Sequence, residues 1–134
     1  MRLWTVVLLL MECAVLASDA LPANQQDLVE RYWDYDGKRI SVSGEVVSAD
    51  EMTVMYLPGA TSNSAAKEGM LVTLSDSASK KPDALTKRFA KNLKNTGRVT
   101  AELEGPFEGA ADRRWGHQAC CRFRLQVERV VGLK

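Results

Sequence analysis

Alternation of apolar and polar side chains with a period of two constrains this chain more than any other feature of its sequence. In residues 39–49, Ile40, Val42, Gly44 and Val46 fall on one face, and mostly polar side chains fall on the other. This pattern predicts a β-strand with one buried face. Gly44 interrupts the row of branched side chains, which predicts a bend or bulge at a point that a side chain would crowd.

Four further segments are expected to be strands. Residues 52–57, 69–75 and 98–105 are short apolar or alternating runs bounded by turn-forming residues. Residues 120–131 alternate over a longer stretch, and Cys121, Phe123, Leu125 and Val127 are predicted to face inward. Residues 60–68 and 106–117 have neither pattern and are expected to be loops.

Two segments have helical spacing. In residues 82–95, Leu85, Phe89 and Leu93 recur every fourth position, and Gly97 follows as a stop signal. A weaker pattern in residues 23–33 predicts a short N-terminal helix. The expected fold is all-β with one inserted helix, a five-stranded OB-fold-like barrel preceded by the short N-terminal helix.

The start of the chain is expected to be a signal peptide that covers residues 1–20, which leaves residues 21–134 as a single OB-fold-like domain. Arg2 supplies a positive charge, residues 3–16 are largely apolar, and Ala17 or Ala20 fits the last position before a cleavage site. A membrane anchor is disfavoured because a spanning helix needs about 20 apolar residues and Glu12 interrupts this run. We therefore expect export, to the periplasm in a Gram-negative organism.

A short motif follows the predicted N-terminal helix. An aromatic-Asp-Gly-Lys turn, Tyr35-Asp36-Gly37-Lys38, leads into a strand of the form V-x-V-x-G, and a Gly116-His117 pair precedes the last predicted strand. This arrangement resembles that of many small exported bacterial OB-fold proteins, most of them uncharacterised. The resemblance implies a fold more than an activity, because one fold hosts many functions.

Two adjacent cysteines stand at the start of the last predicted strand. Successive strand residues point to opposite faces, so Cys121 is expected to be buried and Cys120 to be exposed beside Arg122 and Arg124. Cys120 is then predicted to be the more reactive thiol. A disulfide between the two is not expected, because a regular strand does not provide the distorted geometry that it requires.

The cysteine pair also suggests an alternative function, a soft-metal-binding or thiol redox-sensing protein that uses His117, Cys120 and Cys121, with a methionine as a further metal ligand. A zinc signature has paired ligands at set spacings, and this segment has half of one. We therefore expect no metal and no other cofactor. His117 has no partner nucleophile or acid in a recognisable arrangement, so we expect no enzymatic activity.

The predicted loop 106–117 concentrates the residues expected to bind a ligand: Phe107, Arg113, Arg114 and Trp115. Aromatic rings and guanidinium planes stack on flat or ring-shaped ligands, and arginine also pairs with anions. The alternative is that Trp115 closes the end of the barrel and the arginines are solvated. A net charge of +1 disfavours nucleic acid, so a protein, a cell-wall fragment or a small molecule is the expected partner. The predicted function is an exported binding or protein-interaction module.

Overall fold

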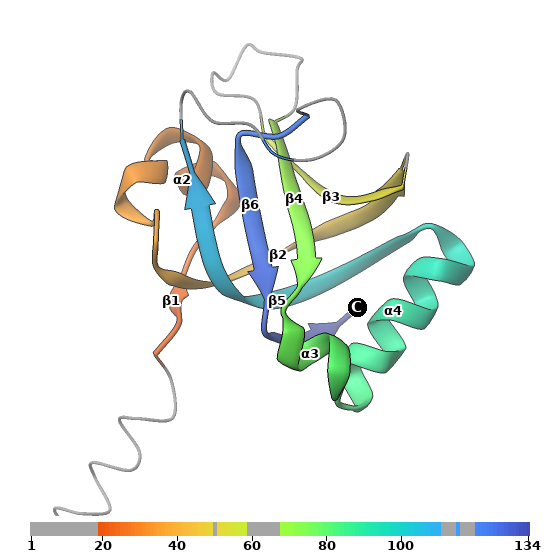
Figure 1. Ribbon diagram of the computed structural model, residues 1–134. Coiled ribbons are helices and arrows are strands. Elements are labelled where there is room, and N and C mark those ends of the chain that lie inside the picture. The colour runs from red at the N-terminus through yellow and green to blue at the C-terminus, as the bar shows by residue number, and fades with distance from the viewer. Residues whose placement is uncertain (1–18, 50, 59–67, 111–114, 116–119) are drawn as a thin grey trace, which may run out of the picture.

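Five strands form a closed barrel in the computed structural model, which describes residues 19–49, 51–58, 68–110, 115 and 120–134. The barrel strands are β2 (Arg39–Ala49), β3 (Met52–Leu57), β4 (Glu68–Leu74), β5 (Arg98–Gly109) and β6 (Phe123–Val127). Pairing runs from β2 through β3, β4, β6 and β5 and back to β2, and only the β4–β6 contact is parallel within this ring (Figure 1). The predicted five-stranded barrel is therefore confirmed as a closed, mixed barrel.

Two short strands extend the sheet beyond the barrel. β1 (Leu21–Pro22) pairs in parallel with β2, and β7 (Arg129–Leu133) pairs antiparallel with β5. The prediction of a single strand over residues 120–131 is wrong, because β6 ends before Glu128 and the chain then leaves the barrel as β7. Gly105 permits this change of direction, since any Cβ at that position would collide with the backbone carbonyl oxygen of Gln126.

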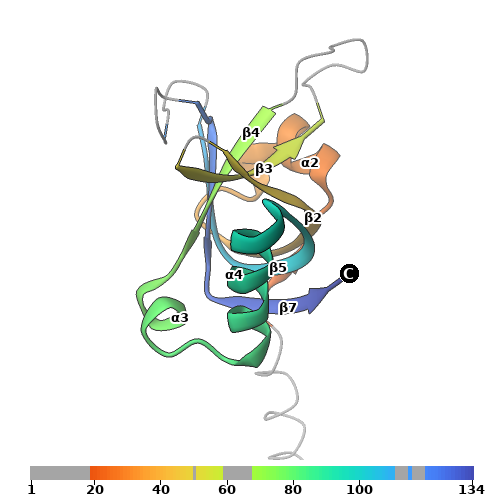
Figure 2. The ribbon, with the colours of Figure 1, turned by 90° about the vertical axis from the view of Figure 1, so that its right-hand side faces the viewer.

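Both segments with helical spacing, residues 23–33 and 82–95, contain helices. The N-terminal segment forms α2 (Gln25–Glu30) and the 3-10 helix η1 (Tyr32–Asp34), and the inserted segment forms α4 (Ala84–Thr96). α4 begins after Asp83, whose carboxylate accepts a hydrogen bond from the Thr86 N–H at 2.8 Å, and it ends at Gly97 in the left-handed conformation. α4 packs against β2, β5 and β7 (Figure 2).

One inserted helix was predicted, and the structure has two. α3 (Asp76–Lys80) lies between β4 and α4, and the hydroxyl of its N-cap Ser75 accepts a hydrogen bond from the Ala78 N–H. The helix has five residues, of which only Ala78 is buried, so it has no apolar period to detect. None of the helices within the described ranges is both long enough and apolar enough to cross a membrane.

The alternation in β2 places its apolar side chains in the core, as predicted. Ile40, Val42 and Val46 are at most 1% exposed. The expected crowding at Gly44 is also confirmed, because a Cβ there would lie 2.7 Å from Met55 Sδ and would meet the Gln25 side chain as well. Of the expected bend or bulge, the bulge is absent, because the β2–β5 register runs without a shift from Arg39 to Val47.

Candidate functional site

Phe107, the first of the predicted ligand-binding residues, is a core residue. The loop was expected to start at Pro106, but β5 continues to Gly109 and keeps its alternation of buried and half-buried positions. Phe107 is fully buried, and its ring stacks on Phe123 with the centroids 5.9 Å apart. The prediction that Phe107 lies in a loop is wrong. It assumed that Pro106 ends the strand, but Pro106 is tolerated at the end of the β2–β5 ladder.

Trp115 is half-buried and lies near one end of β6. It forms an isolated bridge with Cys121, in which each residue's N–H donates to the other's carbonyl, at 2.8 and 3.1 Å. The guanidinium of Arg124 lies 5.4 Å from the centre of the Trp115 ring, within the range of a cation–π contact. Arg113, Arg114 and His117 lie outside the described residues, so their roles stay predictions. The structure therefore brings Trp115 together with Arg124 and separates it from Phe107.

Cys120 and Cys121 are joined by a disulfide, which contradicts the expectation that they remain separate thiols. That expectation rested on a regular strand, but β6 begins only at Phe123, so the pair precedes the strand and escapes its geometry. The predicted difference in exposure is confirmed: Cys120 is exposed and Cys121 is 1% exposed. In this oxidised state neither sulfur atom is available as the thiolate ligand that the soft-metal alternative requires.

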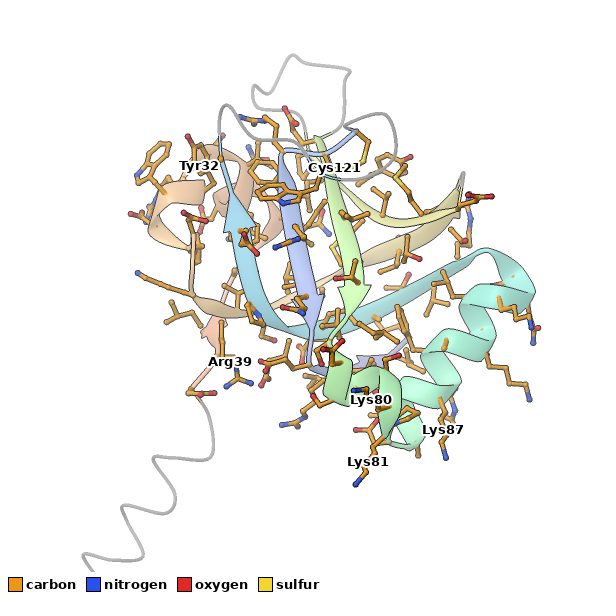
Figure 3. The ribbon with its side chains drawn as sticks, viewed as in Figure 1. Tyr32, Arg39, Lys80, Lys81, Lys87 and Cys121 are labelled. Carbon is orange, nitrogen blue, oxygen red and sulfur yellow. A yellow bond between two sulfur atoms is a disulfide. The ribbon has the colours of Figure 1, made fainter. Side chains whose placement is uncertain are left out.

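Cys121 was predicted to face into the barrel. It is buried instead against the outer side of the barrel wall. It is absent from the main core cluster, and so is Val54, which precedes the core residue Met55 on β3. A Cβ on Gly69 would lie 3.0 Å from Cys121 Sγ and 3.6 Å from a Val54 methyl group, so the sulfur occupies the space that Gly69 leaves open. Figure 3 shows Cys121 at the end of the barrel where the chain enters β6.

Cys120 extends the same group of sulfur atoms across the surface. Its Sγ lies 3.8 Å from Met52 Sδ and 3.5 Å from the Trp115 carbonyl oxygen. We call Met52, Cys120 and Cys121 the sulfur cluster. Because Met52 is the first residue of β3, the cluster connects the residues before β6 to the second strand of the barrel.

A groove of about 740 Å³ opens next to the sulfur cluster, and Met52 belongs to both. It exists because β3 and β4 pair only between Val54–Leu57 and Glu68–Leu71, so that the first residues of β3 and the last residues of β4 separate. α4 contributes the remaining wall. The apolar lining residues include Met52, Leu71, Leu74, Phe89, Ala90 and Leu93, and the polar ones include Ser48, Glu51, Thr53, Thr73, Ser79 and Lys94.

No pattern in the sequence indicates this groove. Its residues come from three segments, 48–53, 71–79 and 89–94, that are separated along the chain. Only the divergence of β3 from β4 brings them together, and no local pattern reports that divergence.

Positive charges immediately before β6 and on β6 are paired with carboxylates. Arg122 lies 3.3 Å from Glu68, and Arg124 forms an ion pair with Glu108. Elsewhere, Arg39 contacts Glu128 at 2.7 Å and also Asp19, and hydrogen bonds to these carboxylates raise its pKa above the ordinary value.

Exposed lysines gather away from the sulfur cluster. Lys80 and Lys81 at α3 and Lys87 on α4 lie near the opposite end of the barrel from Cys121 (Figure 3). Their exposure agrees with a solvated surface. Within the described part of the chain, no three histidine, cysteine, aspartate or glutamate side chains lie close enough to share a metal ion.

No protein-family model matches this chain, and no curated protein matches it.

Proposed function

We propose that this chain is a non-enzymatic binding module of the OB-fold type, and that the groove between β3, β4 and α4 is its ligand site. The strand order supports the fold assignment. Counted within the barrel from β2 to β6, the strands pair in the order 1-2-3-5-4-1, with the third and fifth parallel and helices between the third and fourth. An OB-fold is a five-stranded Greek-key barrel of this kind.

The position of the groove is the observation that carries the proposal. OB-folds bind ligands on the face of their second and third strands, with help from the loops between strands one and two and between strands four and five. Here the second and third barrel strands are β3 and β4, which provide two walls of the groove. Glu51, in the connection between the first and second barrel strands, lines the groove. Trp115, in the connection between the fourth and fifth, contacts Cys120 of the sulfur cluster next to the groove.

The lining favours a ligand with an apolar body and a few polar groups. Leu71, Phe89 and Leu93 offer apolar contact, while hydroxyls such as that of Thr73 and the charge of Lys94 stand among them. A volume of about 740 Å³ falls within the range of about 300–1,000 Å³ that is usual for small-ligand sites. A small molecule, an apolar group of a cell-wall fragment or a side chain of a protein partner fits this description.

Charge argues against a long polyanion as the ligand. The chain has a net charge of +1, and Arg122 before β6 and Arg124 on β6 already contact carboxylates. A nucleic acid would have to displace those carboxylates and would gain little from the release of counterions.

Backbone amide NMR with three probes tests the proposal. The probes are anilinonaphthalene sulfonate for an apolar ligand, N-acetylmuramoyl dipeptide for a cell-wall fragment, and an oligothymidylate for nucleic acid. We expect saturable shifts at Leu71, Thr73 and Ala90 with one of the first two probes and none with the third. Shifts confined to Trp115 and its neighbours would assign the site to the β5–β6 connection, and an absence of saturable shifts with all probes would contradict the proposal.

A matched pair of substitutions on α4 serves as the control. Ala90 and Ala84 are both exposed alanines on this helix, but only Ala90 lines the groove. Ala90→Phe should fill the groove and weaken probe binding at least tenfold, whereas Ala84→Phe should leave it unchanged. Equal loss in both variants would show that the effect comes from the helix and not from the groove.

We also propose that the chain is exported after removal of its leader, on the strength of Arg2 and the apolar run that follows it. Cleavage after Ala17 would keep Asp19 and its ion pair with Arg39, whereas cleavage after Ala20 would remove it. The mass of the chain recovered from the periplasm of a Gram-negative host distinguishes the two sites. Full-length protein confined to the cytoplasm would contradict export.

A further inference from the structure

We propose that the disulfide between Cys120 and Cys121 is a reversible thiol–disulfide exchange site that a dithiol opens by attack at Cys120 Sγ, and that opening it loosens the bridge to Trp115. This inference is independent of the binding proposal, because it concerns the sulfur atoms and their neighbours whether or not the groove binds a ligand.

Access decides which sulfur is attacked. Cys120 is exposed, while Cys121 is 1% exposed and has its Sγ in the space above Gly69. Thiol–disulfide exchange requires the incoming thiolate to reach the sulfur atom, so an external thiol can meet only Cys120.

The exchange balances with a dithiol as the reductant. A dithiol thiolate bonds to Cys120 Sγ, the bond between the two cysteines breaks, and Cys121 Sγ leaves as a thiolate that takes a proton. The second thiol of the reagent, as its thiolate, then bonds to the reagent's first sulfur. The bond between that sulfur and Cys120 Sγ breaks, and Cys120 Sγ leaves as a thiolate that takes a proton. The protein gains two electrons and two protons, and the dithiol becomes a disulfide.

Chain-entropy stabilisation does not explain this disulfide. Cross-links stabilise folded proteins mainly by closing loops of the unfolded chain, and the effect grows with loop length. The two cysteines are adjacent, so the bond closes no loop between distant residues. Its consequence is local: it closes a small ring around the Cys120–Cys121 peptide bond and limits the conformations of that backbone.

The restricted backbone is the part that contacts Trp115. The N–H and carbonyl of Cys121 form both hydrogen bonds of the Trp115 bridge, and Cys120 Sγ contacts Met52 at the edge of the groove. Reduction restores rotation at these residues while the barrel around them stays paired. We therefore expect the change to be felt at Trp115, whose ring packs on Arg124, and at Met52.

The first experiment follows the thiols by mass. A Cys13→Ser background leaves the pair as the chain's only cysteines. The protein is equilibrated in mixtures of reduced and oxidised dithiothreitol, quenched with acid, alkylated with iodoacetamide and weighed. We expect one transition from no label to two labels, which oxidised dithiothreitol reverses. A pair that stays oxidised in excess dithiothreitol, or that reoxidises only into dimers, would overturn the proposal.

Single-serine variants identify the attacked sulfur. In the same background, Cys121→Ser leaves Cys120 as a thiol, and Cys120→Ser leaves Cys121. We expect at least tenfold faster labelling, and faster mixed-disulfide formation with oxidised glutathione, at Cys120 than at Cys121. Equal rates, or faster reaction at Cys121, would refute attack at Cys120.

NMR of the tryptophan indole N–H groups tests the coupling to Trp115. Trp33 is the internal control, because it is 62% exposed on η1 and packs on Tyr32. Trp115→Phe and Trp33→Phe variants assign their two signals among those of the chain's three tryptophans. Reduction should shift the Trp115 signal and leave the Trp33 signal in place, and a variant with both Cys120→Ser and Cys121→Ser should show the shifted position in either redox condition. A reduced protein with an unshifted Trp115 signal would overturn the coupling.

Discussion

Substitution of Phe107 distinguishes a core residue from a loop residue that binds ligand. Phe107→Ala removes a ring that is fully buried and stacked on Phe123. Such truncations cost about 3–5 kcal/mol in protein cores, and an aromatic pair contributes about 0.5–1.5 kcal/mol beyond its buried area. We therefore expect a loss of about 4 kcal/mol, a large share of the roughly 5–15 kcal/mol that stabilises a typical domain.

Urea unfolding followed by circular dichroism measures this loss. The midpoint should fall while the slope of the transition stays constant, since a changed slope would indicate a different unfolded or native state. For a domain of this size the melting temperature should drop by about 10–20 °C. Phe107→Leu guards against complete unfolding and should cost about 1–2 kcal/mol. Trp33→Ala provides the control, because this aromatic side chain is 62% exposed and should cost much less.

A loss below about 1 kcal/mol for Phe107→Ala would refute the core placement, because a truncated, fully buried aromatic ring cannot be that inexpensive. Such a result would return Phe107 to the loop that the sequence predicts. Its effect on probe binding would then have to be measured directly.

Two further substitutions test the packing of β2 and the start of α4. Gly44→Val should cost about 1–3 kcal/mol or prevent folding, because its Cβ would lie 2.7 Å from Met55 Sδ, and an unchanged melting temperature would contradict this packing. Asp83→Ala should lower the melting temperature at neutral pH, because the carboxylate caps α4 through Thr86, and hydrogen bonds from this residue lower the Asp83 pKa. The stabilisation is complete above the unfolded-state pKa and is lost as pH falls through the lower folded-state value, so the difference between wild type and Asp83→Ala should shrink in acid. Asp83→Asn should keep the cap without that pH dependence, and a wild-type advantage that persists at low pH would contradict the mechanism.

Local patterns predicted the elements whose apolar face is set by their own residues. β2 and β3 have the bounds expected from the sequence, Arg39–Ala49 and Met52–Leu57, because alternation is a property of a single strand. α4 has nearly the expected bounds because its apolar stripe, its cap and the terminal Gly97 all lie within a few turns. The barrel then followed from the order of the strands and helices.

Predictions failed where a distant segment decides the outcome. The last strand divides at Glu128 because the backbone there crosses close to Gly105 on β5. β5 extends past Pro106 because β2 and the preceding turn offer it partners: the Phe107 N–H donates to the Lys38 carbonyl at 2.9 Å. In both places the residues that determine the structure lie outside the window in which the pattern was observed.

Cys121 illustrates why a correct prediction of burial can still assign the wrong face. Its spacing from Phe123, Leu125 and Val127 predicted an inward side chain, and it is indeed 1% exposed. However, periodicity applies only within the strand, and the strand starts after Cys121. What buries its sulfur is the space left by Gly69, which belongs to β4 and carries no signal in the sequence around the cysteines. That space places a disulfide on the barrel surface, where Cys120 contacts Met52 at the edge of the groove.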